Sequence, residues 1–295
     1  CLLLLTPGST LAIAARIATG ALLAGIYPVG MKIAVGWGDK DRGFLVGALV
    51  GALTLGSALP HLISLGGGAD WRVTVSIASI AAIAAGLLCL GVKIGPLHTR
   101  AATFDAKAIA IAWTNRKVRL AIAGYLGHIW VALACSQSFQ ATMAQPAAEQ
   151  LAKLTAFSAI AAGGIACAVA GLAADRIGKA NVTIIAMLVS GTAAILTAVT
   201  FGGPAWLTML VVIIWGIAIV PDSAQFSALV ADHAPVGMAG SLMTLQTALG
   251  FALTIVTVQA TPVLASFFGW PPVLALLAIG PAFGVVAMRR LKAMA

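Results

Sequence analysis

The sequence predicts an all-α membrane protein that crosses the bilayer about nine times. Of its 295 residues, 61% are hydrophobic and only 8% are charged, and the mean hydropathy is +1.06. A soluble domain carries about 25% charged residues, so these few ionised groups cannot cover a water-exposed surface. The apolar residues also fall into runs of roughly 20, the length that a helix needs to cross a hydrocarbon core about 30 Å thick.

The apolar runs follow one another along the chain, and each is expected to be a helix because lipid offers the backbone no hydrogen-bond partner. We place the spans at residues 11–34, 44–65, 73–92, 120–143, 154–174, 182–201, 207–230, 238–260 and 273–288. The connections are short and contain helix breakers, such as the glycines at 66–68 and the two prolines at 271–272. Consecutive helices are therefore expected to be antiparallel neighbours.

One longer connection divides the predicted spans into two groups. Residues 93–119 alternate apolar residues with six basic ones, namely Lys93, Arg100, Lys107, Arg116, Lys117 and Arg119. This mixture predicts a helix that lies at the membrane surface. We expect residues 1–92 to form the remainder of an N-terminal helical bundle, residues 93–117 a linker with this interfacial helix, and residues 118–295 a six-helix C-terminal bundle.

The basic residues predict the orientation in the membrane. Thirteen of the 17 lie in loops on one side of the predicted spans, two lie on the other side, and Arg16 and Lys32 lie within the first span. The positive-inside rule then places the linker and the C-terminus in the cytoplasm, and we expect a multi-pass protein of the bacterial inner membrane. The net charge of +9 is thus a topology signal, so the expected partners are the lipid bilayer and a small solute, without nucleic acid.

The sequence contains no pattern that indicates an enzyme or a bound cofactor. His-Glu-x-x-His, Gly-x-Ser-x-Gly and the phosphate-binding loop are absent, and eight acidic residues leave few carboxylates for acid–base chemistry. The four cysteines show no Cys-x-x-Cys spacing, which argues against a metal site or a disulfide framework. We expect no catalytic residues, no metal and no cofactor, and a monomer.

The most specific motif lies between the fifth and sixth predicted spans and includes Gly171, Asp175, Arg176, Gly178 and Lys179. It is explained either as a charged turn or as a functional loop. The pattern resembles the G-x-x-x-D-R-x-G-[R/K] signature of the major facilitator superfamily (MFS). The resemblance implies a two-bundle transporter in which this loop is a conformational latch. Physically, the aspartate would accept hydrogen bonds from a neighbouring helix N-terminus and pair with the arginine.

Two further patterns in the first and second spans resemble the same superfamily. Arg16 and Gly20 resemble the R-x-x-x-G pattern of its fourth helix. Gly43, Gly47 and Gly51 predict close helix packing and resemble its glycine-rich fifth helix, although the pattern of its antiporters is incomplete here. In this register about helices 4 to 12 of twelve are present, and an N-terminally truncated chain is expected.

The resemblance implies that the first, fourth and seventh visible spans line a central pathway. Candidate substrate-contacting residues are Arg16, Tyr27, His128, Trp215 and Gln246. An ionisable residue within a span is a functional candidate, so His128 and Asp222 are candidates for proton coupling. The alternatives are that Arg16 extends to the outer surface, that His128 and Gln246 only bond neighbouring helices, and that Asp222, close to Gln225, is a charge at a helix end.

The expected function is secondary transport of a small solute by alternating access, with proton coupling. Arg16 and His128 favour an organic or inorganic anion. The alternative within this class is a proton-coupled exporter of drugs or metabolites. The alternative from another class is a membrane sensor or scaffold without transport activity. The substrate, the coupling ion and the choice between symport and antiport do not follow from the residues.

Overall fold

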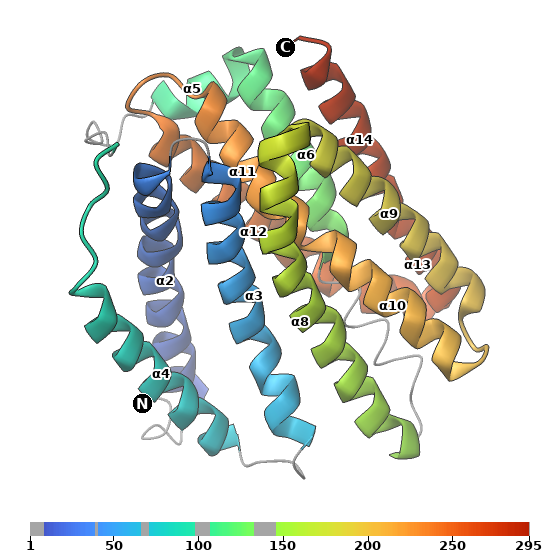
Figure 1. The fold of residues 1–295 in the computed structure, drawn as a ribbon. Helices are drawn as coiled ribbons and strands as arrows, with labels where there is room; N and C mark the ends of the chain where they lie inside the picture. The colour runs from blue at the N-terminus through green and yellow to red at the C-terminus, as the bar shows by residue number, and fades with distance from the viewer. Residues whose placement is uncertain (1–8, 39–40, 66–70, 98–106, 133–145, 295) are drawn as a thin grey trace.

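The computed structural model describes the chain except for residues 1–8, 39–40, 66–70, 98–106, 133–145 and 295, and every element in the described part is a helix (Figure 1). The helices are α2 (Ser9–Trp37), α3 (Arg42–Leu65), α4 (Trp71–Cys89), α5 (Lys107–Thr114), α6 (Arg116–Ala132), α8 (Pro146–Ile177), α9 (Lys179–Thr200), α10 (Ala205–Ile219), α11 (Pro221–His233), α12 (Ala239–Phe268), α13 (Trp270–Leu277) and α14 (Ile279–Lys292).

Eight segments of the described chain are long and apolar enough to cross a membrane. They correspond to eight of the nine predicted spans, with two of them built from helix pairs, α10 with α11 and α13 with α14. The remaining predicted span, residues 120–143, contains α6 as far as Ala132, and its second half lies outside the described residues. The structure is that of an integral, multi-pass membrane protein.

Two predicted spans are interrupted, which corrects their assignment as single helices. α10 ends at Ile219 and α11 begins at Pro221. Proline has no N–H to donate to the carbonyl four residues earlier and its ring crowds that carbonyl, so the helix breaks there. In the last span Pro281 has the same effect just after the junction of α13 and α14.

The predicted surface helix of the linker corresponds in part to α5. Its Ala112 is buried against the core that surrounds α6, whereas Trp113 is 65% exposed. An exposed tryptophan beside basic residues is typical of a helix at the membrane interface, and this location stays a prediction.

The closest helix contact joins α3 to α8, which lie side by side in Figure 1. Three glycines of α3, Gly43, Gly47 and Gly51, face the backbone of α8. A Cβ added at Gly47 would overlap the carbonyl oxygen of Cys167, and one added at Gly43 would lie 2.9 Å from the carbonyl oxygen of Gly171. The two backbones therefore touch because neither helix carries side chains there.

The short helix α11 lies at the centre of the described bundle. It contacts α3, α6, α8, α9 and α12, and all of its residues from Pro221 to Val230 are buried except Ser223. By contrast, the described side chains of α4 are mostly exposed, and its apolar composition suits a helix that faces lipid. A polar group on α11 is thus held inside the protein.

We expect the substitution Gly47→Ala to destabilise the protein, because the new methyl group meets the α8 backbone and overpacking costs about 1–3 kcal/mol. The measurement is equilibrium unfolding of the purified protein in detergent. The matched control is Gly56→Ala on the same helix, where an added Cβ has no neighbouring heavy atom within 4 Å. Equal unfolding free energies for the two variants would contradict the packing described for α3 and α8.

Candidate functional site

A histidine and an aspartate lie at ion-pair distance in the interior of the bundle. Nδ1 of His128 on α6 lies 2.7 Å from Oδ1 of Asp222 on α11, and the two side chains are only 4% and 1% exposed. Removing two charges from water is costly unless they face each other at hydrogen-bonding distance. Asp222 is thus a residue at a helix end and also a buried carboxylate with a partner on another helix.

The break at Pro221 positions the aspartate. Because the chain restarts as α11 at Pro221, Asp222 lies in the first turn of that helix. There both oxygens of its carboxylate are buried, and Oδ1 faces the imidazole of His128. The positive end of the α11 dipole also favours a negative charge at this point. The interruption of the span therefore creates the polar environment that a buried carboxylate requires.

Two aromatic rings enclose the ion pair. The His128 ring centroid lies 6.0 Å from that of Tyr125 and 6.2 Å from that of Phe226, and the two aromatic rings meet edge to face at 6.3 Å. Both rings are buried, which removes water and strengthens the electrostatic interaction between the charges. Tyr125 also contacts α12, because a Cβ added at Gly250 would lie 2.5 Å from its ring.

Two glutamines near this cluster have no hydrogen-bond partner among the described residues. Gln225, one turn after Asp222 on α11, and Gln246, one turn before Gly250 on α12, are both 0% exposed, and their amide oxygens and nitrogens are unpaired. Buried polar groups are nearly always bonded, so each exception calls for an explanation. Both amides thus keep unused donors and acceptors inside the bundle.

The other predicted pathway residues lie elsewhere. Trp215 is fully buried in a separate cluster, where its indole N–H donates to Ser190 Oγ at 3.0 Å and ties α10 to α9. Tyr27 packs at the contact of α2 with α3 and lies against Ser227 of α11. Arg16 is exposed on α2, and nothing lies within 4 Å of a Cβ added at Gly20. The structure therefore brings His128 and Asp222 together without Arg16.

The signature loop contacts the start of α3. Oδ1 of Asp175 accepts a hydrogen bond from the N–H of Gly43 at 3.0 Å, and Oδ2 accepts one from the N–H of Phe44 at 3.1 Å. These bonds satisfy N–H groups that have no partner within the helix and place a negative charge at its positive end. An interaction between residues 132 positions apart thus holds the ends of α3 and α8 together.

The remaining residues of the loop have different roles. Arg176 is exposed and has no ion pair within the described part of the chain. Gly178 has φ +92°, a backbone conformation that favours glycine. The ammonium of Lys179 pairs with Asp232 at the end of α11, at 2.5 Å. The use of this loop as a latch remains a prediction.

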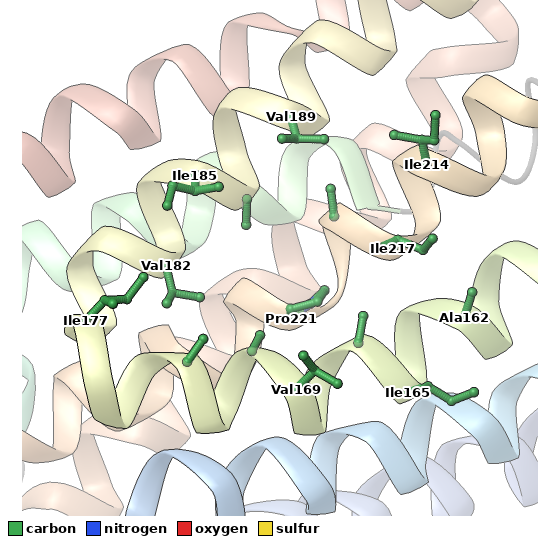
Figure 2. Close-up of a pocket in the computed structure, with 15 residues that line it drawn as sticks. Ala162, Ile165, Val169, Ile177, Val182, Ile185, Val189, Ile214, Ile217 and Pro221 are labelled. Carbon is green, nitrogen blue, oxygen red and sulfur yellow. The ribbon is translucent and has the colours of Figure 1, made fainter.

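An apolar groove of about 720 Å³ lies between α8, α9 and α10. Figure 2 shows side chains such as Val169, Ile185 and Ile217 lining it with carbon atoms only. Pro221 also lines the groove, directly before Asp222 in the chain. Among the described residues no group of three or more histidine, cysteine or acidic side chains is arranged to hold a metal ion.

The pairing of His128 with Asp222 predicts strong energetic coupling. Removing one partner leaves the other buried side chain without its hydrogen bond, so Asp222→Asn or His128→Gln alone is expected to cost about 1–3 kcal/mol of unfolding free energy. The double variant is expected to cost less than the sum of the two. Equilibrium unfolding in detergent measures all three variants, with the exposed Asp41→Asn as the control for loss of one carboxylate. Additive effects of the two substitutions would show that the side chains do not interact.

The comparisons with known proteins agree with the helical architecture. Residues 1–258 match the family model described as Major Facilitator Superfamily, which is most of the chain. A search of curated proteins found no match. Together with the eight membrane-spanning segments, the family match shows that this chain belongs to the Major Facilitator Superfamily of membrane transporters.

Proposed function

We propose that this chain is a proton-coupled secondary transporter that moves a small polar solute by alternating access, with His128 and Asp222 as the proton-carrying pair. The observation that carries the proposal is the burial of both side chains at 2.7 Å beside a broken helix. An ionisable pair inside a membrane bundle is costly to maintain and is typical of proton relays.

The chemistry of the pair provides a switch. When His128 is protonated and Asp222 is ionised, the imidazolium donates a hydrogen bond to the carboxylate and the two opposite charges attract each other. A second proton on Asp222 neutralises the carboxylate and removes this attraction, although one hydrogen bond can persist. The free energy that holds α6 against α11 thus depends on proton binding.

The position of α11 would transmit this change to the contact between the bundles. On one side of the helix, Asp222 and Phe226 face His128 and Tyr125 of α6. Elsewhere on α11, Ala224 packs against a cluster on α2, α3 and α8, which is formed by Met31, Val46, Val50 and Cys167. A shift of α11 therefore changes the packing at the α3–α8 contact, and alternating access requires such a movement of one bundle against the other.

The substrate-binding groups we propose are the amides of Gln225 and Gln246. Their unpaired donors and acceptors suit a solute with both oxygen acceptors and hydroxyl or amine donors. His128 is the basic side chain of this cluster, because Arg16 is exposed on α2. Small organic and inorganic anions are therefore the first solutes to test, with His128 as the group that would select them.

A second candidate is export of amphiphilic compounds, favoured by the apolar groove between α8, α9 and α10. The groove reaches Pro221, which directly precedes the buried Asp222 in the chain. An exporter of this type takes its substrate from the lipid and binds its proton on a buried acidic group. In this chain Asp222 would be that acidic group.

Transport assays distinguish these candidates from the sensor or scaffold alternative. The purified chain is reconstituted in liposomes with an imposed pH gradient, and a panel of labelled carboxylates, oxyanions and a fluorescent lipophilic cation is offered. We expect saturable, gradient-driven movement of one class. Movement of none of them would support the sensor or scaffold alternative.

If His128 and Asp222 carry the proton, their loss should abolish accumulation driven by the proton gradient but not the exchange of solute across the membrane. In Asp222→Asn and His128→Gln liposomes, gradient-driven accumulation should fall to the level of empty vesicles, because the pair can no longer take up and release a proton. Exchange of labelled for unlabelled solute across the membrane, which needs no net proton movement, should continue. Asp41→Asn serves as the control, and unchanged accumulation in the two pair variants would refute proton carriage by these residues.

The latch role predicts that Asp175→Ala loosens the contact between α3 and α8. Losing a helix N-terminal cap costs about 1 kcal/mol, which corresponds to a roughly fivefold larger open population. The buried thiol of Cys167, which faces α3, reports this opening through its rate of reaction with a maleimide. The other three cysteines are replaced by serine for this measurement.

The control for the latch is Arg176→Ala, the neighbouring exposed residue that makes no ion pair among the described residues. It should leave the labelling rate of Cys167 unchanged. If both substitutions accelerate labelling equally, the Asp175 contact is not what closes this end of the bundle.

A further inference from the structure

A second, polar cavity opens at one end of the bundle, away from the ion pair. It has a volume of about 460 Å³ and lies where α6 and α9 begin and where α8, α11 and α14 end. Its charged or titratable lining residues are Lys117, Asp175, Lys179, Asp232, His233 and Lys292. The cavity thus gathers three lysines from three different helices around one space.

The two carboxylates of this cavity already have partners. Asp175 accepts the two backbone N–H groups of α3, and Asp232 pairs with Lys179. Neither Lys117 nor Lys292 forms an ion pair within the described ranges of the chain. Lys117, Lys179 and Asp232 are all close enough to His233 to act on it electrostatically. The cavity therefore has two lysines free to bind an anion.

The backbone at the edge of the cavity adds further donors. Gly178, Lys179, Ala180 and Asn181 line it, at the N-cap and first turn of α9, which no side chain caps. The N–H groups of Gly178 and Asn181 already donate to the carbonyls of Ala174 and Gly178, so the remaining donors are those of Lys179 and Ala180. In contrast, the start of α6 is capped by Asn115, whose Oδ1 accepts the N–H groups of Lys117 and Val118. The positive end of the α9 dipole therefore adds to the field of the lysines.

We propose that this cavity binds a phosphate group, with Lys117 and Lys292 as its cationic contacts and the first turn of α9 as a source of backbone donors. Lysine ammonium groups bind phosphate as point charges. The volume exceeds that of a single oxyanion, so the group is expected to belong to a phospholipid headgroup or to a free phosphate compound. Because Asp175 lines the same cavity, a bound phosphate lies near the residue that holds α3 and would influence the α3–α8 contact through charge repulsion.

The test measures binding to the purified full chain with two sources of phosphate. Titration calorimetry with inorganic phosphate in detergent tests the free ion. The thermal stability in nanodiscs of phosphatidylcholine, with and without phosphatidylglycerol, tests an anionic headgroup. Lys117→Gln and Lys292→Gln should each weaken the interaction about tenfold, because each removes one charge-assisted contact. Lys117→Arg, which keeps the charge, should retain binding.

The matched control is Arg290→Gln, which removes one positive charge from the same helix as Lys292 but does not line the cavity. Binding of inorganic phosphate that is lost only in the cavity variants identifies a free phosphate compound as the ligand. Stabilisation by phosphatidylglycerol alone, lost in the same variants, identifies a headgroup. No response to either source, or an equal loss in Arg290→Gln, would overturn the proposal.

Discussion

The backbone contact between α3 and α8 is the constraint on which the rest of the structure depends. Membrane helices gain little from burying apolar side chains against one another, because lipid is equally apolar, so they associate by close packing and polar contacts. Here Gly47 and Gly51 let α3 meet the backbone of α8, and Asp175 binds the N–H groups at the end of α3. Such a contact requires small residues on both helices, because an added side chain would meet the opposite backbone.

The broken span at Pro221 places an acidic side chain inside this packed arrangement. The restart of the chain at α11 places Asp222 in the first turn of a helix, where the positive end of the helix dipole favours a negative charge. The same short helix packs on α3 and α8 through Ala224. One interruption therefore places a buried carboxylate on a short helix that also packs against α3 and α8.

The sequence predicted the architecture well and the site only in part. Apolar runs located eight spans that the structure contains, because the length of a membrane helix is set by the thickness of the bilayer. Periodicity did not reveal that two of these spans are interrupted, although Pro221 and Pro281 were visible signals. His128 and Asp222 were both selected as ionisable residues within spans, yet nothing in their positions indicated that they are partners. Gln225 was noted only as a neighbour of Asp222.

By itself, the sequence determined that the chain is a helical membrane protein with a basic linker and the motifs of a transporter superfamily, because composition, run length and local signatures are properties of neighbouring residues. Only the tertiary structure decided which distant residues meet. It paired His128 with Asp222, placed Asp175 on the start of α3, and separated Trp215 and Arg16 from the ion pair. Such pairings depend on the rotation and depth of each helix, which are set by packing against several others at once.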